Sequence, residues 1–212
     1  MHGATLLDAS DNVLRPCILW NDTRSALEAA ELDAVPIFRR LTGNIVFPGF
    51  TAPKLSWVRT HEPDFFEQVA KVLLPKDYLR LWLSGEHVAE MSDAAGTSWL
   101  DVEKRDWSDD LLAATGLTRS YMPRLVEGSE ASGTLRAVLA NLWGLRSDVI
   151  IAGVGSDNSA CASGVGVVHV GDSFGRRGTS GVLLAASYSY HPLVAIFLLT
   201  LSQSCPADWV PL

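Results

Sequence analysis

The sequence predicts an α/β fold in which helices alternate with short strands. Segments with the apolar spacing of helices recur along the chain, and short β-branched runs lie between them. The composition, with 48% hydrophobic and 19% charged residues, is that of a globular protein. A length of 212 residues suits one domain, or one domain with part of a second.

The N-terminal segment has the pattern of a β-hairpin. Residues 4–7 and 13–20 are the candidate strands, and the polar run 8–12 between them has turn chemistry. A helix is predicted next over residues 24–32, with N-cap candidates at positions 21–23.

Proline and glycine mark the boundaries of the following elements. A helix is predicted over residues 36–41 and is ended by Gly43, and another begins at Pro53. The apolar run 71–74 predicts a short buried strand that leads into a helix at Pro75.

Later in the chain, Thr134 is a candidate cap for a helix that ends at Gly144. The helical spacing predicts an inward face made of Leu135, Val138, Leu139 and Leu142. β-Branched residues then predict a strand over residues 148–152, and the small residues at 153–166 predict a turn and a helix that allow close approach.

Charge is distributed unevenly along the chain. All 17 Lys and Arg residues lie at or before Arg177, and Asp208 is the one charged residue after it. A folded surface is normally about a quarter charged. The break therefore predicts that residues 1–177 form one unit, and that the tail is either the opening of a second domain or aberrant sequence.

The composition argues against several classes of function. The formal net charge of −7 disfavours a nucleic-acid partner, because such proteins need a positive surface. The N-terminus lacks the pattern of a signal peptide, and the longest apolar run, residues 192–201, is too short to cross a bilayer. We therefore expect a cytoplasmic protein with no membrane partner.

Neither a disulfide framework nor a metal site is indicated. The three cysteines, Cys17, Cys161 and Cys205, are odd in number and far apart, and they lack the CxxC spacing of zinc sites. The five histidines also lack a metal-binding spacing.

Asp157 is the foremost candidate for chemistry. It lies between a predicted strand and a predicted helix, at the end of the strand where α/β proteins bind ligands. Its carboxylate can act as a general base or can cap the helix, and the spacing fits both roles equally. A second candidate, Gly178-Thr179-Ser180-Gly181, offers amides and hydroxyls to a phosphate, although four small residues also suit an ordinary turn.

The third candidate is the segment that contains Trp20, Asp22 and Arg24. An aromatic ring beside polar groups can stack on a sugar while those groups bind its hydroxyls. In the alternative interpretation, which the segment alone favours, Trp20 belongs to the core, Asp22 caps a helix and Arg24 is solvated.

Several motifs occur together in a fixed order. They are Met1-His2-Gly3, Leu19-Trp20-Asn21-Asp22-Thr23-Arg24, Pro48-Gly49-Phe50-Thr51-Ala52-Pro53-Lys54-Leu55, Leu73-Leu74-Pro75-Lys76-Asp77-Tyr78-Leu79, Ser92-Asp93-Ala94-Ala95-Gly96-Thr97, Asp106-Trp107-Ser108 and Gly155-Ser156-Asp157-Asn158. In this series the chain resembles the FGGY carbohydrate kinase family over about residues 1–182, and within it the branch that phosphorylates D-xylulose.

The resemblance implies a fold, a reaction and roles for residues. FGGY kinases have two ribonuclease H-like (actin-like ATPase) domains around a cleft, and they transfer the γ-phosphate of ATP, bound with Mg²⁺, to a sugar hydroxyl. The matching motifs imply that Asp157 is the catalytic base and that Gly178, Thr179, Ser180 and Gly181 form a phosphate loop for ATP. The residues implied to bind the small-molecule substrate, D-xylulose, are Met1, His2, Trp20, Asp22, Arg24 and Asn158.

The resemblance also divides the chain. Residues 1–170 are expected to be part of an N-terminal sugar-binding domain that lacks its first strands, residues 171–182 the start of the C-terminal domain, and residues 183–212 an aberrant or unassigned tail. Missing strands leave open sheet edges, so self-association is expected. An incomplete site predicts that this chain alone is inactive. Two alternatives stay open: a non-catalytic sugar-binding remnant and an unstable truncated product.

Overall fold

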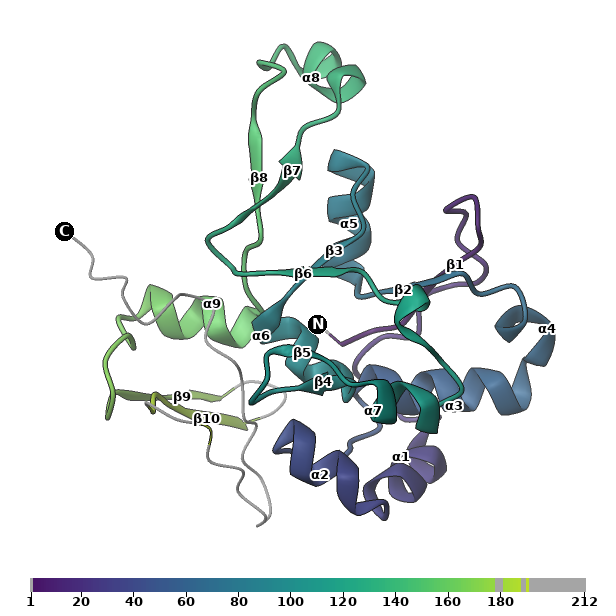
Figure 1. The fold of residues 1–212 in the computed structure, drawn as a ribbon. Helices are drawn as coiled ribbons and strands as arrows, with labels where there is room; N and C mark the ends of the chain where they lie inside the picture. The colour runs from purple at the N-terminus through teal and green to yellow at the C-terminus, as the bar shows by residue number, and fades with distance from the viewer. Residues whose placement is uncertain (1, 178–180, 188–189, 191–212) are drawn as a thin grey trace.

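Helices and short strands alternate along the chain in the computed structural model, which describes residues 2–177, 181–187 and 190. This mixed architecture confirms the α/β class predicted from the sequence. Figure 1 shows a body that contains the N-terminal segment and most helices, with a narrow arm extending from it at the top of the view.

The strands of the described residues pair two by two. Four pairs are antiparallel, and the pair of β3 and β6 is parallel. The pairs are β1 (Thr5–Leu7) with β2 (Lys71–Leu73), β3 (Val88–Glu90) with β6 (Arg124–Val126), β4 (Leu100–Asp101) with β5 (Asp106–Trp107), β7 (Ala131–Thr134) with β8 (Ile150–Ala152), and β9 (Ser173–Arg177) with β10 (Gly181–Ala185).

The predicted N-terminal hairpin forms only in part. Isolated bridges join Ala4 to Ile18 and Leu7 to Val13, so the chain does turn back on itself. The returning segment is not a continuous strand, because Pro16 lies within it and has no N–H to donate to a ladder. The regular partner of β1 is instead β2, from much later in the sequence.

Most predicted helices form. The α-helices are α1 (Ala26–Asp33), α2 (Pro36–Thr42), α3 (Thr51–His61), α4 (Pro63–Phe66), α5 (Pro75–Ser84), α6 (Met91–Ala94), α7 (Asp109–Ala114), α8 (Ala137–Trp143) and α9 (Asp157–Gly164), with short 3₁₀ turns η1 (Ala95–Thr97) and η2 (Arg119–Tyr121). Gly43 and Gly144 end α2 and α8 with φ angles of 68° and 65°, the left-handed conformation predicted for these positions.

Some predicted boundaries were wrong. The first helix begins at Ala26, because Asp22 accepts the Arg24 N–H in a local turn that precedes the helix. The helix predicted to begin at Pro53 begins at Thr51. Thr134 ends β7 and does not cap α8.

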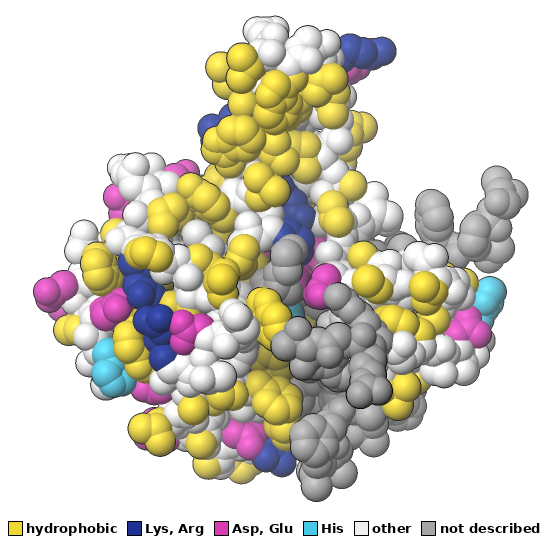
Figure 2. All heavy atoms as spheres, turned by 180° about the vertical axis from the view of Figure 1, so that it is seen from behind, with side chains coloured by type: hydrophobic (Ala, Val, Ile, Leu, Met, Phe, Trp, Pro, Cys, Tyr) yellow, Lys and Arg dark blue, Asp and Glu magenta, His cyan; other side chains and the backbone are white. Residues whose placement is uncertain are grey.

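The predicted inward face of α8 was also wrong in part. Val138 and Leu142 are 68% and 74% exposed, whereas Leu139 is buried. Leu135, which precedes the helix, packs with Leu139 and Ala140 in a small cluster of their own. These residues belong to the arm, which consists of β7, α8 and β8, and Figure 2 shows apolar side chains gathered on its surface. The main core lies in the body, around Leu55 and Val58 of α3 and the strand β1.

The C-terminal part forms a hairpin. Strands β9 and β10 pair antiparallel around positions 178–180, which lie outside the described residues. Tyr190 donates its hydroxyl to the Arg40 carbonyl at 3.0 Å, while residues 191–212, with Cys205 and Asp208, also lie outside. Cys17 and Cys161 are free thiols. Among the described helices none is long and apolar enough to span a membrane.

Candidate functional site

Asp157 is the first residue of α9, after a short turn that follows β8. The sequence left two roles for it, and the structure gives the capping role to Ser156. The Ser156 hydroxyl accepts the N–H of Ser159 at 3.2 Å and is therefore the side chain that caps the helix. The Asp157 residue is exposed, and Asn158 beside it is partly buried. A carboxylate at this helix start is also favoured by the helix dipole.

His2 lies near Asp157 and is held by a buried carboxylate. Its Nε2 is 3.1 Å from Oδ1 of Asp93, and its side chain is 12% exposed. The ring meets Phe50 edge-on at 5.5 Å between centroids. It also covers Gly96, where a Cβ atom would lie 2.1 Å from Nε2. Glycine is therefore required at position 96 for the ring to sit there.

The electrostatics of His2 favour the neutral ring. Burial lowers its pKa below 6.5, and this outweighs the opposing effects of the Asp93 hydrogen bond and of the Asp157 charge. In the neutral ring with its proton on Nε2, the nitrogen beside Asp93, Nδ1 is a hydrogen-bond acceptor. The ring is thus prepared to accept a hydrogen bond from a hydroxyl group.

Asp93, the partner of His2, belongs to a buried group of charged side chains, here called the charge cluster: Lys76, Asp77, Arg80, Glu90 and Asp93. The Lys76 ammonium is central. Its Nζ lies 2.6 Å from Asp77, 3.4 Å from Asp93 and 3.6 Å from Glu90. Arg80 donates to Asp77 at 2.8 Å. Two positive groups thus face three carboxyl groups where water has little access.

The pKa shifts within the charge cluster follow from burial and pairing. Burial raises the pKa of Asp77 and of Glu90. Burial acts the same way on Asp93, but the His2 hydrogen bond and the Lys76 charge overcome it and lower the pKa of this carboxyl. Burial alone would lower the pKa of Lys76, but the three carboxylates raise it. Lys76 and Asp93 are therefore charged at neutral pH.

The Trp20–Arg24 segment forms a second part of the site. Arg24 Nε lies 3.0 Å from both oxygens of Asp22, and Nη2 lies 2.6 Å from Oδ2. This two-pronged contact lowers the pKa of Asp22 to about 2. The Arg24 guanidinium also lies over the ring of Trp57, 4.9 Å from its centroid. Trp20 is 50% exposed, so the interpretation of it as a core residue was wrong.

One segment, residues 47–54, borders both parts of the site. At Gly49 a Cβ atom would lie 2.9 Å from the Trp20 carbonyl oxygen. Phe50 contacts the His2 ring. Further along the segment, the Asp22 charge raises the pKa of Lys54, against the larger effect of burial. The structure therefore places His2 with Asp157, and it places Trp20, Asp22 and Arg24 along the same segment that supports His2.

Most of the remaining sequence candidates are not among the residues that the structure describes. Met1 and residues 178–180 lie outside the described residues, and Gly181 begins β10. Within the described residues no group of three or more His, Cys, Asp or Glu side chains could hold a metal ion.

Sequence reasoning did not single out the charge cluster or Lys54. Charged side chains are usually exposed. Lys54, Lys76, Asp77 and Asp93 lie in motifs that indicated only the resemblance, and Arg80 and Glu90 lie outside those motifs. A signal was present, since Lys54 lies between the apolar residues Pro53 and Leu55 in a segment with helical spacing. It is fully buried.

Comparison with known proteins gives consistent matches. The family model described as "FGGY family of carbohydrate kinases, N-terminal domain" matches residues 1–164. The chain is 56% identical over 191 residues to a xylulose kinase of Escherichia coli (strain K12), covering 90% of this chain and 39% of that protein. It is 50% identical over 210 residues to a xylulose kinase of Klebsiella pneumoniae, covering 99% of this chain and 43% of that protein. That alignment therefore includes most of the charge-poor tail.

A solved structure agrees with these matches. The crystal structure titled as a "xyloylose kinase" from Brucella ovis superposes with a TM-score of 0.89 at 65% sequence identity, over 91% of this chain and 40% of that one. The chain thus spans about two fifths of the length of the proteins that it matches.

Proposed function

Since the chain belongs to the FGGY family of carbohydrate kinases, we propose that the protein to which these residues belong transfers the γ-phosphate of ATP to the 5-hydroxyl of D-xylulose. The names of its relatives support the substrate. The observation that carries the proposal is the position of Asp157. Its exposed carboxylate, at the start of α9, is close enough to His2 for its charge to affect the pKa of that ring.

The proposed chemistry uses these residues as follows. The sugar hydroxyl attacks the γ-phosphorus, the bond from that phosphorus to the bridging oxygen of ADP breaks, and the hydroxyl proton passes to the Asp157 carboxylate. His2 accepts a hydrogen bond from another sugar hydroxyl through Nδ1. Trp20 offers its ring to the sugar, and Arg24, fixed by Asp22, donates to it. Met1 and Asn158 are proposed as further sugar contacts.

We also propose the division of the chain that the resemblance implies. Residues 1–170 would bind the sugar, and residues 171–182 would begin the second domain, with Gly178, Thr179, Ser180 and Gly181 as its phosphate loop. The match of the N-terminal family model over residues 1–164 supports the first assignment. The pairing of β9 with β10 places Arg177 and Gly181, the residues on either side of positions 178–180, opposite each other.

The first test measures sugar binding. A thermal melt of the 212-residue chain followed by circular dichroism should shift upward with D-xylulose, by about 2.7 kcal/mol of added stability at a hundredfold excess over Kd. Trp20→Ala should abolish the shift. Trp82→Ala is the matched control, because Trp82 is exposed to a similar extent but lies on α5. No shift, or an equal shift in Trp20→Ala, contradicts the proposal.

The second test concerns the base. Asp157→Asn keeps the shape of the side chain but cannot accept the proton, so it should bind D-xylulose normally. In a form of the protein that phosphorylates D-xylulose, the variant should lower kcat by about 10²- to 10⁴-fold with little change in KM. A variant with full kcat would refute the role of Asp157. We expect the 212-residue chain alone to bind the sugar without phosphorylating it, and release of ADP by this chain would contradict that.

A further inference from the structure

The turn that presents Asp157 has an unusual backbone. Val154 has a φ of 65°, in the left-handed region that β-branched residues rarely adopt. At Gly153, before it, a Cβ atom would lie 2.1 Å from the Glu127 carbonyl oxygen, so no side chain fits there. Such a conformation persists only where neighbouring groups hold it.

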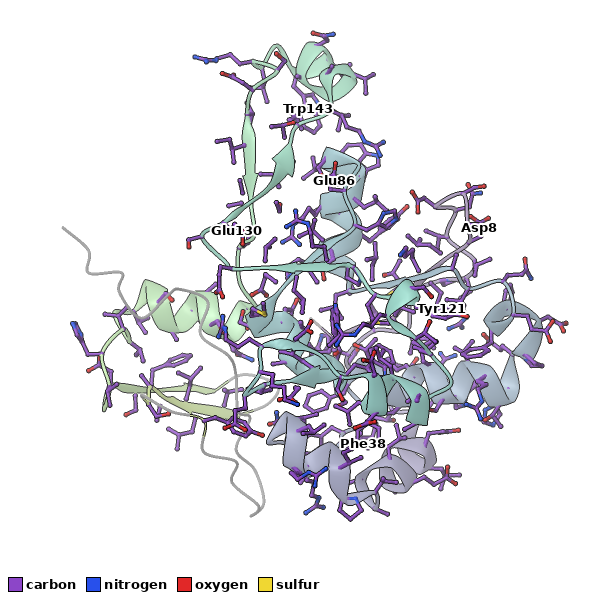
Figure 3. The ribbon with its side chains drawn as sticks, in the orientation of Figure 1. Asp8, Phe38, Glu86, Tyr121, Glu130 and Trp143 are labelled. Carbon is purple, nitrogen blue, oxygen red and sulfur yellow. The ribbon has the colours of Figure 1, made fainter. Side chains whose placement is uncertain are left out.

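Two of the hydrogen bonds that hold this turn come from the base of the arm. The Gly153 N–H donates to the Glu130 carbonyl at 2.8 Å, and the Val154 N–H donates to the Gly128 carbonyl at 2.7 Å. Glu130 lies where the chain passes from β6 into β7, as its label in Figure 3 shows. These bonds tie the turn to the backbone on one side.

The other two bonds come from side chains in or beside the charge cluster. Arg80 donates through Nη2 to the Gly153 carbonyl, and through Nη1 to Asp77 at 2.8 Å. Ser92 Oγ accepts the Ser156 N–H at 2.9 Å. The turn is thus fixed at its first and last residues by two different buried side chains.

Ser92 is itself held in a fixed orientation. Its hydroxyl donates to Oε2 of Glu90 at 2.7 Å, so its oxygen lone pairs face the Ser156 amide. Glu90 also caps the first turn of α6 by accepting the N–H groups of Ser92 and Asp93, at 2.8 Å and 2.7 Å. Asp93, the neighbour of Ser92 in that helix, pairs with His2. One helical turn therefore supports both His2 and the turn before Asp157.

We propose that Ser92 and Arg80 are positioning residues that hold turn 153–156, and with it the Asp157 carboxylate, at a fixed place relative to His2. The inference rests on the proposed function, which supplies the roles of Asp157 and His2. Neither positioning residue needs to touch the sugar. The charge cluster serves as their common support, because Glu90 orients Ser92 and Asp77 orients Arg80.

The experiment compares two serine variants of the 212-residue chain. Ser92→Ala removes the acceptor of the Ser156 amide. Ser108→Ala also removes a buried serine hydroxyl with one amide partner, but at the N-cap of α7. Amide hydrogen exchange, followed residue by residue by NMR, should be about tenfold faster at Ser156 in Ser92→Ala than in wild type, the loss of roughly one hydrogen bond. In Ser108→Ala the Ser156 amide should exchange as in wild type.

A second variant keeps the inference testable if Ser92→Ala does not fold. Arg80→Lys retains the positive charge beside Asp77 but lacks the second guanidinium nitrogen, which donates to the Gly153 carbonyl. It should therefore also speed amide exchange at Ser156. Unprotected exchange at Ser156 in the wild-type chain, or equal exchange in Ser92→Ala and Ser108→Ala, would overturn the inference.

Sugar binding separates this inference from the proposed function. If wild type binds D-xylulose, Ser92→Ala should weaken Kd by about tenfold, because the turn that it releases also places Asn158, a proposed sugar contact that Asp157→Asn leaves in position. Ser108→Ala should leave Kd unchanged. An unchanged Kd in Ser92→Ala would refute the positioning role. If wild type does not bind D-xylulose, the proposed function fails, and exchange at Ser156 still decides whether Ser92 holds the turn.

Discussion

At the scale of single residues, Lys54 makes the free energy of unfolding depend on pH. It is fully buried in α3, and its Nζ donates to the Pro48 carbonyl at 2.5 Å. Burial lowers its pKa from 10.5 to about 8, so between these values the unfolded chain binds more protons than the folded chain. The contribution of Lys54 to the free energy of unfolding should therefore rise by about 3 kcal/mol as pH increases through this window.

Lys54→Met tests this dependence, because Met fills similar space without a charge. The Pro48 carbonyl keeps a partner in the variant, since Ser25 Oγ also donates to it. Urea unfolding at several pH values between 8 and 10.5 should show the rise in wild type and its loss in the variant. Lys104→Met, at a lysine whose side chain is 78% exposed, is the control. The same slope in wild type and Lys54→Met would contradict the assignment.

Which single residues could be predicted depended on where their partners come from. The place of Asp157 followed from its flanking strand and helix, so local sequence sufficed. The burial of Glu90 did not, because its partner Lys76 comes from a different element. Trp20, which the segment alone placed in the core, is half exposed and does not belong to the main core.

At the scale of elements, the 3₁₀ turn η1 sets the place of His2. Gly96→Ala would put a Cβ 2.1 Å from the His2 ring, so the ring must leave Asp93 or η1 must shift. We expect the pKa of His2 to rise toward 6.5 as the ring loses its burial, and D-xylulose binding to weaken. NMR titration of the histidine ring measures the first effect.

Gly164→Ala is the matched control for this substitution. Gly164 is the last residue of α9, and nothing lies within 4 Å of a Cβ placed there. Alanine also favours a helix over glycine by up to about 1 kcal/mol, so the control should be neutral or slightly stabilising. A His2 pKa that stays low in Gly96→Ala would contradict the tight packing of ring on glycine.

Element boundaries were predictable where a backbone rule decides them. Pro75 begins α5, and Gly43 ends α2, because proline and glycine constrain φ directly. Thr134 was misplaced because its capping signal competes with pairing to β8, where it faces Ile150. The pairing of β1 with β2 was also outside local rules, since it joins residues far apart in the sequence.

At the scale of the whole molecule, the arm should open independently of the body. Its cluster of Leu135, Leu139 and Ala140 is separate from the main core. Leu139→Ala should therefore speed amide exchange throughout β7, α8 and β8 and leave α3 unchanged, since a buried leucine is worth about 2–5 kcal/mol. Leu142→Ala, at a leucine that is 74% exposed, is the control. Equal effects on arm and body would mean that the molecule unfolds as one unit.

Self-association stays a prediction at this scale. Exposed apolar side chains on the arm, among them Val138 and Leu142, support it. Surfaces of this kind favour contacts between copies.

The burial of the charge cluster has a consequence for the response of the site to salt. Dissolved ions screen charges that they can approach, over roughly 8 Å at physiological ionic strength. The Asp22–Arg24 pair is open to them, with side chains 27% and 37% exposed, whereas Lys76 and Asp93 are at most 9% exposed. Rising ionic strength should therefore loosen the arginine side of the site while the histidine side keeps its geometry.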